Sequence, residues 1–354
     1  MRILVVGDSF CAADAFRPAF GGLANRHEVT YVDIADDPGW AARTPSELRL
    51  KETNGRPEDV IAALDGHEVL VMQGAPVTDA VLDASPLRLV CCARGGPVNV
   101  DLAAATDRGI PVCITPGKNA DAVAELTIAF MVMLARRLPE VLRHVEGGGE
   151  FGHDNYEGRH WFGHDLAGKT LGLVGLGQVG RRVAARAHAF EMRVMGHDPF
   201  LDPRAFEDLG VEHVELPALL AEADFVSLHA RATADNRHLI DAEALARMKP
   251  GAYLINTARD TLLDEAAAAE ALASGRLAGL ALDLVSPSPA DGRHPLLATP
   301  NVVITTHIGG ATFETLHHAA EMAVAEIQRL EAGQPLLHVA NAAGLAATQA
   351  ERAR

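Results

Sequence analysis

The segment Leu171-Gly-Leu-Val-Gly-Leu-Gly-Gln-Val-Gly-Arg-Arg182 decides the fold of this chain. Within it, an apolar run ends in Gly175-x-Gly177-x-x-Gly180, and a helical pattern follows. A strand, a glycine-rich turn and a helix in this order begin a dinucleotide-binding βαβ unit. The next apolar run ends at Asp198, 18 residues beyond Gly180. This is close to the spacing of about 20 residues expected for an acid that binds a ribose.

Each glycine of this turn has a physical role. Gly175 permits the tight turn, Gly177 lets the backbone approach a pyrophosphate, and Gly180 lets the helix pack closely on the strand. The N-terminus of the helix offers unpaired N–H groups and the positive end of a dipole to phosphate oxygens. A carboxylate at Asp198 can accept hydrogen bonds from ribose hydroxyls and would repel a 2′-phosphate. The pattern therefore predicts that the chain binds NAD rather than NADP.

Length and composition place the chain among ordinary globular proteins. It has 354 residues, which suggests two domains, with 48% hydrophobic and 22% charged residues. Its 47 acidic and 31 basic residues give a formal net charge of -16. Non-specific binding to nucleic acid or to an anionic membrane depends on an excess of Lys and Arg, so we expect neither partner. A locally positive pocket for an anionic small molecule is compatible with this charge.

The cysteines and the apolar runs predict a cytoplasmic protein. The chain has four cysteines: Cys11, Cys91, Cys92 and Cys113. They form neither a C-x-x-C pair nor a disulfide framework, so we expect buried thiols. The apolar run after Arg2 stops at Asp8, which is too short for an export signal. The longest apolar stretch, 126–135, is shorter than the roughly 20 residues that span a bilayer.

Strand-like runs alternate with helix-like runs in two series along the chain. The first series predicts strands at 2–7, 29–34, 69–72, 89–92 and 112–114. The second predicts strands at 171–174, 192–195, 225–228, 252–255, 279–282 and 302–305. Alternation at this spacing is typical of βαβ units, so we expect an α/β protein with parallel sheets.

Helices are expected at 56–64, 100–108, 120–145, 181–190 and 312–331. A glycine cluster over 146–152 ends the long helix, and Gly333 stops the last one. The polar segment 36–55 is interpreted as a surface excursion. The alanine-rich tail 342–354 is expected to fray.

Four further motifs accompany the glycine turn. They are Gly117-Lys-Asn-Ala-Asp-Ala-Val-Ala-Glu125, Ser227-Leu-His-Ala-Arg-Ala-Thr233, Met248-Lys-Pro-Gly-Ala-Tyr-Leu-Ile-Asn-Thr-Ala-Arg259 and Thr306-His-Ile-Gly-Gly310. In this order the motifs resemble the D-isomer-specific 2-hydroxyacid dehydrogenase family, which includes phosphoglycerate, glycerate, D-lactate and formate dehydrogenases. The resemblance covers most of the chain. It implies an NAD-dependent oxidoreductase that acts on a CH–OH group and interconverts a 2-hydroxy acid and a 2-keto acid by hydride transfer.

The resemblance also implies an architecture. Family members have two Rossmann-like, doubly wound parallel-sheet domains, with the cofactor domain inserted into the substrate domain. Residues 1–117 and 311–354 would form the substrate domain, and residues 118–310 the NAD-binding domain. Members are usually dimers through the cofactor domain, so a homodimer is expected.

Positions that match the family motifs imply a cofactor-binding set: Gly175, Gly177, Gln178, Val179, Gly180, Asp198, His229, Thr257 and Asp283. By the same resemblance, Arg259 would bind the substrate carboxylate and carbonyl, and His307 would be the general acid and base. An arginine suits the first role because its planar, permanently charged guanidinium can bind a carboxylate bidentately. A histidine suits the second role because an imidazole gives and takes protons near neutral pH.

One position departs from the family pattern. A glutamate that pairs with the histidine is expected five residues after Asp283, and this chain has Ser288 there. Serine can orient an imidazole by a hydrogen bond but cannot supply the charge that favours the imidazolium. Another acid such as Asp291 or Asp260 can substitute, the histidine can work without that charge at a shifted pH optimum, or catalysis can be weakened or lost. We favour the second outcome and treat Ser288 as a third catalytic position.

A second departure lies in the segment Cys92-Ala-Arg-Gly-Gly-Pro-Val-Asn-Val-Asp101. In the family, backbone N–H groups of this loop bind the substrate carboxylate. The resemblance therefore implies a substrate-binding set: Arg94, Gly95, Gly96 and Arg259. Arg94 occupies a position where the family usually has glycine. It either adds a positive charge for a further phosphate or carboxylate of the substrate, or it turns outward to solvent.

Four polar residues form a candidate metal site: His153, Asp154, His160 and His164. Gly158 and Gly163 argue against a rigid helix there, and no second pair of ligands is clear. Zinc sites need a fixed set of ligands, so we expect no metal. A loop that contacts another domain or a second copy of the chain fits this segment better.

A second class of function also fits the sequence. The chain could be a catalytically weakened family member that senses NAD(H) or binds a partner. Ser288 favours this alternative, whereas Arg259 and His307 weigh against it. The sequence does not name the 2-hydroxy acid or the physiological direction of the reaction.

Overall fold

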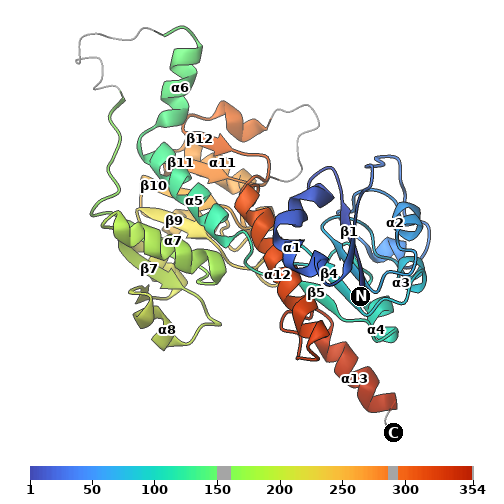
Figure 1. The fold of residues 1–354 in the computed structure, drawn as a ribbon. Coiled ribbons are helices and arrows are strands. Elements are labelled where there is room, and N and C mark those ends of the chain that lie inside the picture. The colour runs from blue at the N-terminus through green and yellow to red at the C-terminus, as the bar shows by residue number, and fades with distance from the viewer. Residues whose placement is uncertain (150–160, 286–293, 353–354) are drawn as a thin grey trace. The chain divides into compact units, whose positions relative to one another are not determined.

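The computed structural model describes residues 1–149, 161–285 and 294–352, and Figure 1 shows its ribbon. The chain divides into two compact units. Unit 1 comprises Met1–Lys118 and Thr312–Arg354, and unit 2 comprises Asn119–Ala311. Among the described residues, no helix combines the length and the apolarity needed to cross a membrane. The roles expected for the two units, substrate domain and cofactor domain, stay predictions.

Unit 1 is built on a five-stranded parallel sheet in the order β2-β1-β3-β4-β5. Its strands are β1 (Arg2–Gly7), β2 (Glu28–Asp33), β3 (Val69–Met72), β4 (Leu89–Cys92) and β5 (Val112–Ile114). Its α-helices are α1 (Arg17–Ala24), α2 (Pro57–Ala63), α3 (Asp79–Asp83), α4 (Leu102–Asp107), α12 (Phe313–Glu331) and α13 (Ala342–Arg352).

Side chains of this sheet alternate between two apolar cores. Leu4 and Val6 of β1 point to a core that they share with α2, α3 and α4. Ile3 and Val5 point to the opposite face, where α1 and α12 pack (Figure 1). Because helices cover both faces, the inner strands β3 and β4 are apolar and buried throughout. The four cysteines lie buried in this unit as free thiols, which confirms the expectation for them.

Unit 2 is built on a seven-stranded parallel sheet in the order β12-β11-β10-β9-β6-β7-β8. Its strands are β6 (Thr170–Val174), β7 (Arg193–His197), β8 (Glu212–His213), β9 (Phe225–Leu228), β10 (Ala252–Asn256), β11 (Leu277–Leu282) and β12 (Val302–Ile304). Its α-helices are α5 (Ala120–Ala135), α6 (Leu138–Glu146), α7 (Gln178–Ala189), α8 (Pro203–Asp208), α9 (Leu216–Glu222), α10 (Ala242–Arg247) and α11 (Glu265–Ala273).

The layers of unit 2 place its ligand-binding edge. Helices α5 and α7 share a core with one face of the sheet, and α9, α10 and α11 share a core with the other face. The strand order reverses between β6 and β9, which are neighbours. Doubly wound sheets bind ligands at such a point, beyond the carboxyl ends of the strands. The α/β class with two parallel sheets is thus confirmed.

The prediction of one helix over 120–145 is wrong, because the chain forms two helices there. Arg137, between α5 and α6, has φ +54°. Pro139 lies in the first turn of α6. Inside a continuous helix this proline would lack an N–H donor and would clash with the carbonyl four residues earlier. The chain therefore turns before the proline and starts a new helix.

The expectation that the C-terminal tail frays is also wrong. The tail forms α13, which ends at Arg352. The residues before it pair with the edge strand β5, where the Ala340 N–H donates to the Val112 carbonyl at 2.8 Å. Asn341 Oδ1 accepts a hydrogen bond from the Val112 N–H at 3.0 Å. This pairing orders the tail, and it joins segments far apart in the sequence.

Candidate active site

The glycine turn lies between β6 and α7. Gly175 has φ +95°, and an added Cβ would lie 2.6 Å from the backbone nitrogen of Ala230. A Cβ on Gly180 would lie 2.1 Å from the carbonyl oxygen of Gly175. Gly177 caps α7, which begins at Gln178 and thus earlier than expected, and its added Cβ would meet nothing within 4 Å. The turn is tightly packed at both ends and open in the middle, where the helix presents unpaired N–H groups.

Asp198 follows β7 and is fixed against the glycine turn. Its Oδ2 accepts a hydrogen bond from the Leu176 N–H at 2.9 Å, and its Oδ1 accepts one from the Phe200 N–H at 3.0 Å. The Gly175 N–H donates to the His197 carbonyl at 2.9 Å. Each carboxylate oxygen has a second acceptor site, so ribose hydroxyls can still bind. The geometry fits NAD, since a 2′-phosphate would meet a negative charge.

Three other expected cofactor residues are fixed within unit 2. His229 follows β9, and its Nε2 is 2.9 Å from the Ser227 hydroxyl oxygen. Burial lowers the pKa of His229 to about 3, so its imidazole is neutral near pH 7. The Thr257 hydroxyl, beyond β10, is 3.0 Å from the hydroxyl of Thr127 on α5. Val179, in the first turn of α7, packs partly against the core.

Arg259 lies beyond β10 in a turn that a buried asparagine holds. Asn256 Nδ2 donates to the Arg259 carbonyl at 2.8 Å, and Asn256 Oδ1 accepts from the Ala258 N–H at 3.0 Å. The Arg259 side chain is exposed, and its Nη1 donates to the Ala258 carbonyl at 2.7 Å. Within the described ranges it forms no ion pair, not even with Asp260 beside it. Most of its donors are therefore available to a carboxylate.

His307 lies beyond β12 in a strained turn that Asp283 holds. Its φ of +61° costs about 1–3 kcal/mol for a residue with a Cβ. The Asp283 carboxylate, which is 2% exposed, accepts a hydrogen bond from the Thr305 hydroxyl at 2.6 Å. It also accepts from the N–H groups of Ile308 at 2.9 Å and Gly309 at 2.7 Å. The imidazole is exposed, and Asp283 fixes the backbone that carries it.

Several positions singled out in the sequence lie outside the described residues: Ser288, Asp291, His153, Asp154 and His160. His164 is described, and its N–H donates to the Ala135 carbonyl at 2.8 Å. No group of three or more His, Cys, Asp or Glu side chains in the described part of the chain could hold a metal ion.

The expected substrate loop follows β4 in unit 1. Gly95 and Gly96 are exposed, and an added Cβ at either would meet nothing within 4 Å. Arg94 forms an ion pair with the Glu52 carboxylate, and its Nη1 donates to the Glu52 carbonyl at 3.0 Å. Its side chain is only 21% exposed. Arg94 is therefore ion-paired and mostly buried, and its expected part in substrate binding stays a prediction.

Three residues that hold these loops were not expected from the sequence. Lys118 Nζ donates to the Ala93 carbonyl at 2.6 Å, and burial lowers the pKa of Lys118. The Asp8 carboxylate, 5% exposed, accepts from the Gly74 N–H at 2.8 Å. Asn256 is the third. A polar residue at the end of an apolar strand was the available signal for Asp8 and Asn256, whereas Lys118 showed only its place in a motif.

Comparison with known proteins places this geometry in a family. Residues 128–309 match the sequence model described as D-isomer specific 2-hydroxyacid dehydrogenase, NAD binding domain. A hydroxypyruvate reductase of Thermotoga maritima is 36% identical over 272 residues, which cover 76% of this chain and 86% of that protein. The chain belongs to the D-isomer specific 2-hydroxyacid dehydrogenase family.

Two further proteins are similar to this chain over different shares of their own length. A D-3-phosphoglycerate dehydrogenase of Archaeoglobus fulgidus is 35% identical over 297 residues, 83% of this chain and 55% of that protein. The chain thus spans about half the length of the phosphoglycerate dehydrogenases it matches. The crystal structure of the TT0316 protein from Thermus thermophilus aligns with a TM-score of 0.74 at 34% identity, over 96% of this chain and 100% of that one.

The residues of unit 2 suit the NAD-binding domain of a 2-hydroxyacid dehydrogenase. The glycine turn, Arg259 and His307 all lie beyond the carboxyl ends of strands in one parallel sheet. Open space at Gly177 and the carboxylate of Asp198 fit a dinucleotide. When bound, NAD supplies hydride transfer. A guanidinium with available donors can hold a carboxylate, and an exposed imidazole can move a proton.

Proposed function

We propose that this protein is an NAD-dependent oxidoreductase that interconverts a 2-hydroxy acid and a 2-keto acid. The observation that carries the proposal is the position of Arg259 after β10 and of His307 after β12, in the sheet whose β6 leads into the glycine turn. Arg259 binds the substrate carboxylate and polarises the carbonyl. The exposed backbone N–H groups of Gly95 and Gly96 are further proposed substrate contacts.

His307 carries the proton in both directions of the reaction. In reduction its imidazolium donates a proton to the carbonyl oxygen as that oxygen gains charge, and in oxidation the neutral imidazole removes the hydroxyl proton. The buried carboxylate of Asp283 keeps the backbone of His307 in place for this transfer. Asn256 does the same for the turn of Arg259.

The test is NADH oxidation with a panel of 2-keto acids: glyoxylate, hydroxypyruvate, phosphohydroxypyruvate and phenylpyruvate. His307→Gln should lower kcat by about 10²-fold or more and retain NADH binding, because it removes only the proton donor. Arg259→Lys should mainly raise KM for the keto acid, because lysine keeps the charge but not the bidentate geometry. A wild-type protein that binds NADH and reduces none of these acids would contradict the proposal.

A second candidate function rests on Ser288, which stands where the family pattern has a glutamate. Without that charge, the chain could bind NAD(H) as a sensor or as the partner of another protein. Thermal stabilisation by NADH without turnover of any keto acid would favour this candidate. Restoring the charge by Ser288→Glu should change the pH dependence of kcat if the chain is an enzyme.

The proposed assembly is a homodimer formed through unit 2. Leu138, Leu142 and Val145 lie on one face of α6 and are 36%, 51% and 38% exposed. Phe162, 73% exposed, adds a further apolar side chain. Contiguous exposed apolar groups of this kind mark protein–protein contacts. Sedimentation equilibrium should give twice the chain mass, and Leu142→Glu should shift it toward the monomer.

A further inference from the structure

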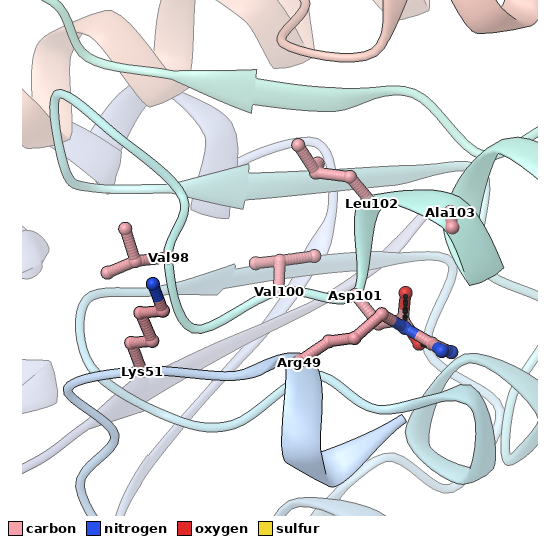
Figure 2. A pocket seen from close by; sticks show the side chains of 7 residues that line it. All are labelled: Arg49, Lys51, Val98, Val100, Asp101, Leu102 and Ala103. Atoms are coloured by element: carbon pink, nitrogen blue, oxygen red, sulfur yellow. Dashed lines mark hydrogen bonds and ion pairs between the residues drawn. The ribbon is translucent and has the colours of Figure 1, made fainter. Parts of the chain in front are cut away.

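A short segment of the connection between β2 and α2, residues 49–54, runs along the substrate loop of unit 1. We call it the covering segment. Four contacts fix it: the Arg49–Asp101 ion pair at 2.6 Å, the hydrogen bond from Lys51 N–H to the Val98 carbonyl at 2.8 Å, the Glu52–Arg94 ion pair, and the hydrogen bond from Asn54 N–H to the Gly74 carbonyl at 2.9 Å. Figure 2 shows Arg49 reaching Asp101, and Lys51 beside Val98, in a pocket of about 360 Å³. Glu52 is thus held beside the loop by contacts on both sides.

Glu52 adopts an unusual backbone conformation to reach Arg94. Its φ is +51°, in the left-handed region that residues with a Cβ rarely adopt. Such a conformation persists only where the surrounding contacts fix it, and it is concentrated at functional sites. The contacts of the covering segment are those that fix it here.

Two cations beside the substrate loop, Arg94 and Lys118, already have partners. Arg94 binds both the carboxylate and the carbonyl of Glu52. Lys118 Nζ donates to the Ala93 carbonyl at 2.6 Å and to Gln73 Oε1 at 3.1 Å. The Arg94–Glu52 pair carries no net charge. A second anionic group of a substrate would have to displace the Glu52 carboxylate or lie beside it.

We propose that Glu52 sets the substrate charge, favouring 2-keto acids with an uncharged side chain over those with a second anionic group. The inference rests on the proposed function and names the substrate class of that same site. A second anionic group of the substrate would be repelled by the Glu52 carboxylate, and such repulsion discriminates strongly against a ligand. A neutral hydroxyl at the same place meets no such repulsion. Hydroxypyruvate and phosphohydroxypyruvate differ only in that the second carries a phosphate on the side-chain hydroxyl. The proposal is thus the opposite of the sequence-based suggestion that Arg94 serves a further phosphate or carboxylate of the substrate.

The test compares wild type with Glu52→Gln, which keeps the size of the side chain and removes its charge. The ratio of kcat/KM for phosphohydroxypyruvate to that for hydroxypyruvate should lie below one in wild type. It should rise at least about tenfold in the variant, through KM rather than kcat, because the released guanidinium can bind a phosphate. The double variant Glu52→Gln with Arg94→Ala should lose this gain.

The matched control is Glu28→Gln, which breaks another Arg–Glu pair of unit 1, with Arg2 at 3.1 Å. It should leave the ratio unchanged. A wild-type preference for phosphohydroxypyruvate, or an unchanged ratio in Glu52→Gln, overturns the proposal. Absence of all turnover refutes the proposed function instead. In that case, calorimetry tests the role of Glu52, with D-glycerate as the reference ligand. Glu52→Gln should bind D-3-phosphoglycerate at least about tenfold more tightly than wild type does. Equal affinities of the two proteins for D-3-phosphoglycerate overturn the proposal.

Discussion

The turn that carries His307 depends on one buried carboxylate, and Asp283→Asn tests that dependence. Asp283 Oδ1 accepts from Thr305 and Ile308, and its Oδ2 accepts from Gly309. An amide has only one accepting oxygen, and its NH₂ group is a donor. Whichever way the asparagine is oriented, at least one N–H or O–H of the turn faces another donor in a buried position.

The bonds of this turn give the size of the effect. A hydrogen bond to a charged group contributes about 1.5–3 kcal/mol, and a buried donor without a partner costs about 1–3 kcal/mol. The loss of one bond and the weakening of the other two should therefore cost about 4 kcal/mol. Relief of the strained φ of His307 would further favour departure of the turn from the observed conformation. At about 1.4 kcal/mol for each factor of ten, the population of the observed turn should fall by up to about 10³-fold.

The assay separates positioning of the imidazole from binding of NADH. Asp283→Asn should lower kcat for hydroxypyruvate by about 10²–10³-fold, with the Kd for NADH, measured by fluorescence, changing less than about fivefold. The control is Asp264→Asn, a cap of α11 that accepts from Ala266 and Ala267 at 3.1 Å, where asparagine caps as well as aspartate. A kcat within threefold of wild type would refute the reasoning. A loss of NADH affinity alone would instead assign Asp283 to the cofactor, as the family resemblance implied.

Three more measurements test other parts of unit 2. Gly177→Ala should leave the Tm of the free protein within about 2 °C of wild type but raise the Kd for NADH at least about tenfold, because its Cβ meets open space until a pyrophosphate binds. Gly21→Ala, on the exposed side of α1, should leave that Kd unchanged and add about 0.5–1 kcal/mol of stability. Asn256→Ala should lower kcat/KM for the keto acid about 10–100-fold at constant NADH affinity, because the turn of Arg259 loses its two hydrogen bonds to the Asn256 side chain. His229 is neutral in the folded protein down to about pH 3, whereas the unfolded chain binds its proton near pH 6.5. The free energy of unfolding should therefore rise with pH between these values. Lowering the pH from 7 to 5 should reduce it by about 2 kcal/mol in wild type, measured by chemical denaturation, and His229→Gln should abolish this loss. Equal acid sensitivity of the two proteins would contradict this expectation.

The α/β class and the glycine turn could be predicted because their signals are local. The strand, the turn with its glycines and the helix lie within about 20 consecutive residues. Asp198 is one strand further on, and the structure ties it to the turn through the Leu176 N–H. The break between α5 and α6 was also readable, since Pro139 cannot continue a helix, although the sequence analysis did not use it.

Other features depended on segments that meet only in the folded chain. The order of the C-terminal tail comes from Asn341, whose amide donates to the carbonyl of Ile110, 231 residues away, at 3.0 Å. The support of His307 comes from Asp283 on the neighbouring strand, 22 to 26 residues away from the groups it binds. Sequence patterns of period 2 or 3.6 describe one element at a time, so they carry no information on such partners.

The sequence by itself determined the chemistry that the chain carries: a dinucleotide turn, an acid suited to NAD, an arginine and a histidine at strand ends, and a family. Only the tertiary structure decided which charges are available. Arg94, a candidate extra cation for the substrate, is ion-paired with Glu52, 42 residues away, whereas Arg259 forms no ion pair in the described residues. The type of a side chain is written in the sequence, but the partner that neutralises its charge is selected by the loops that folding brings together.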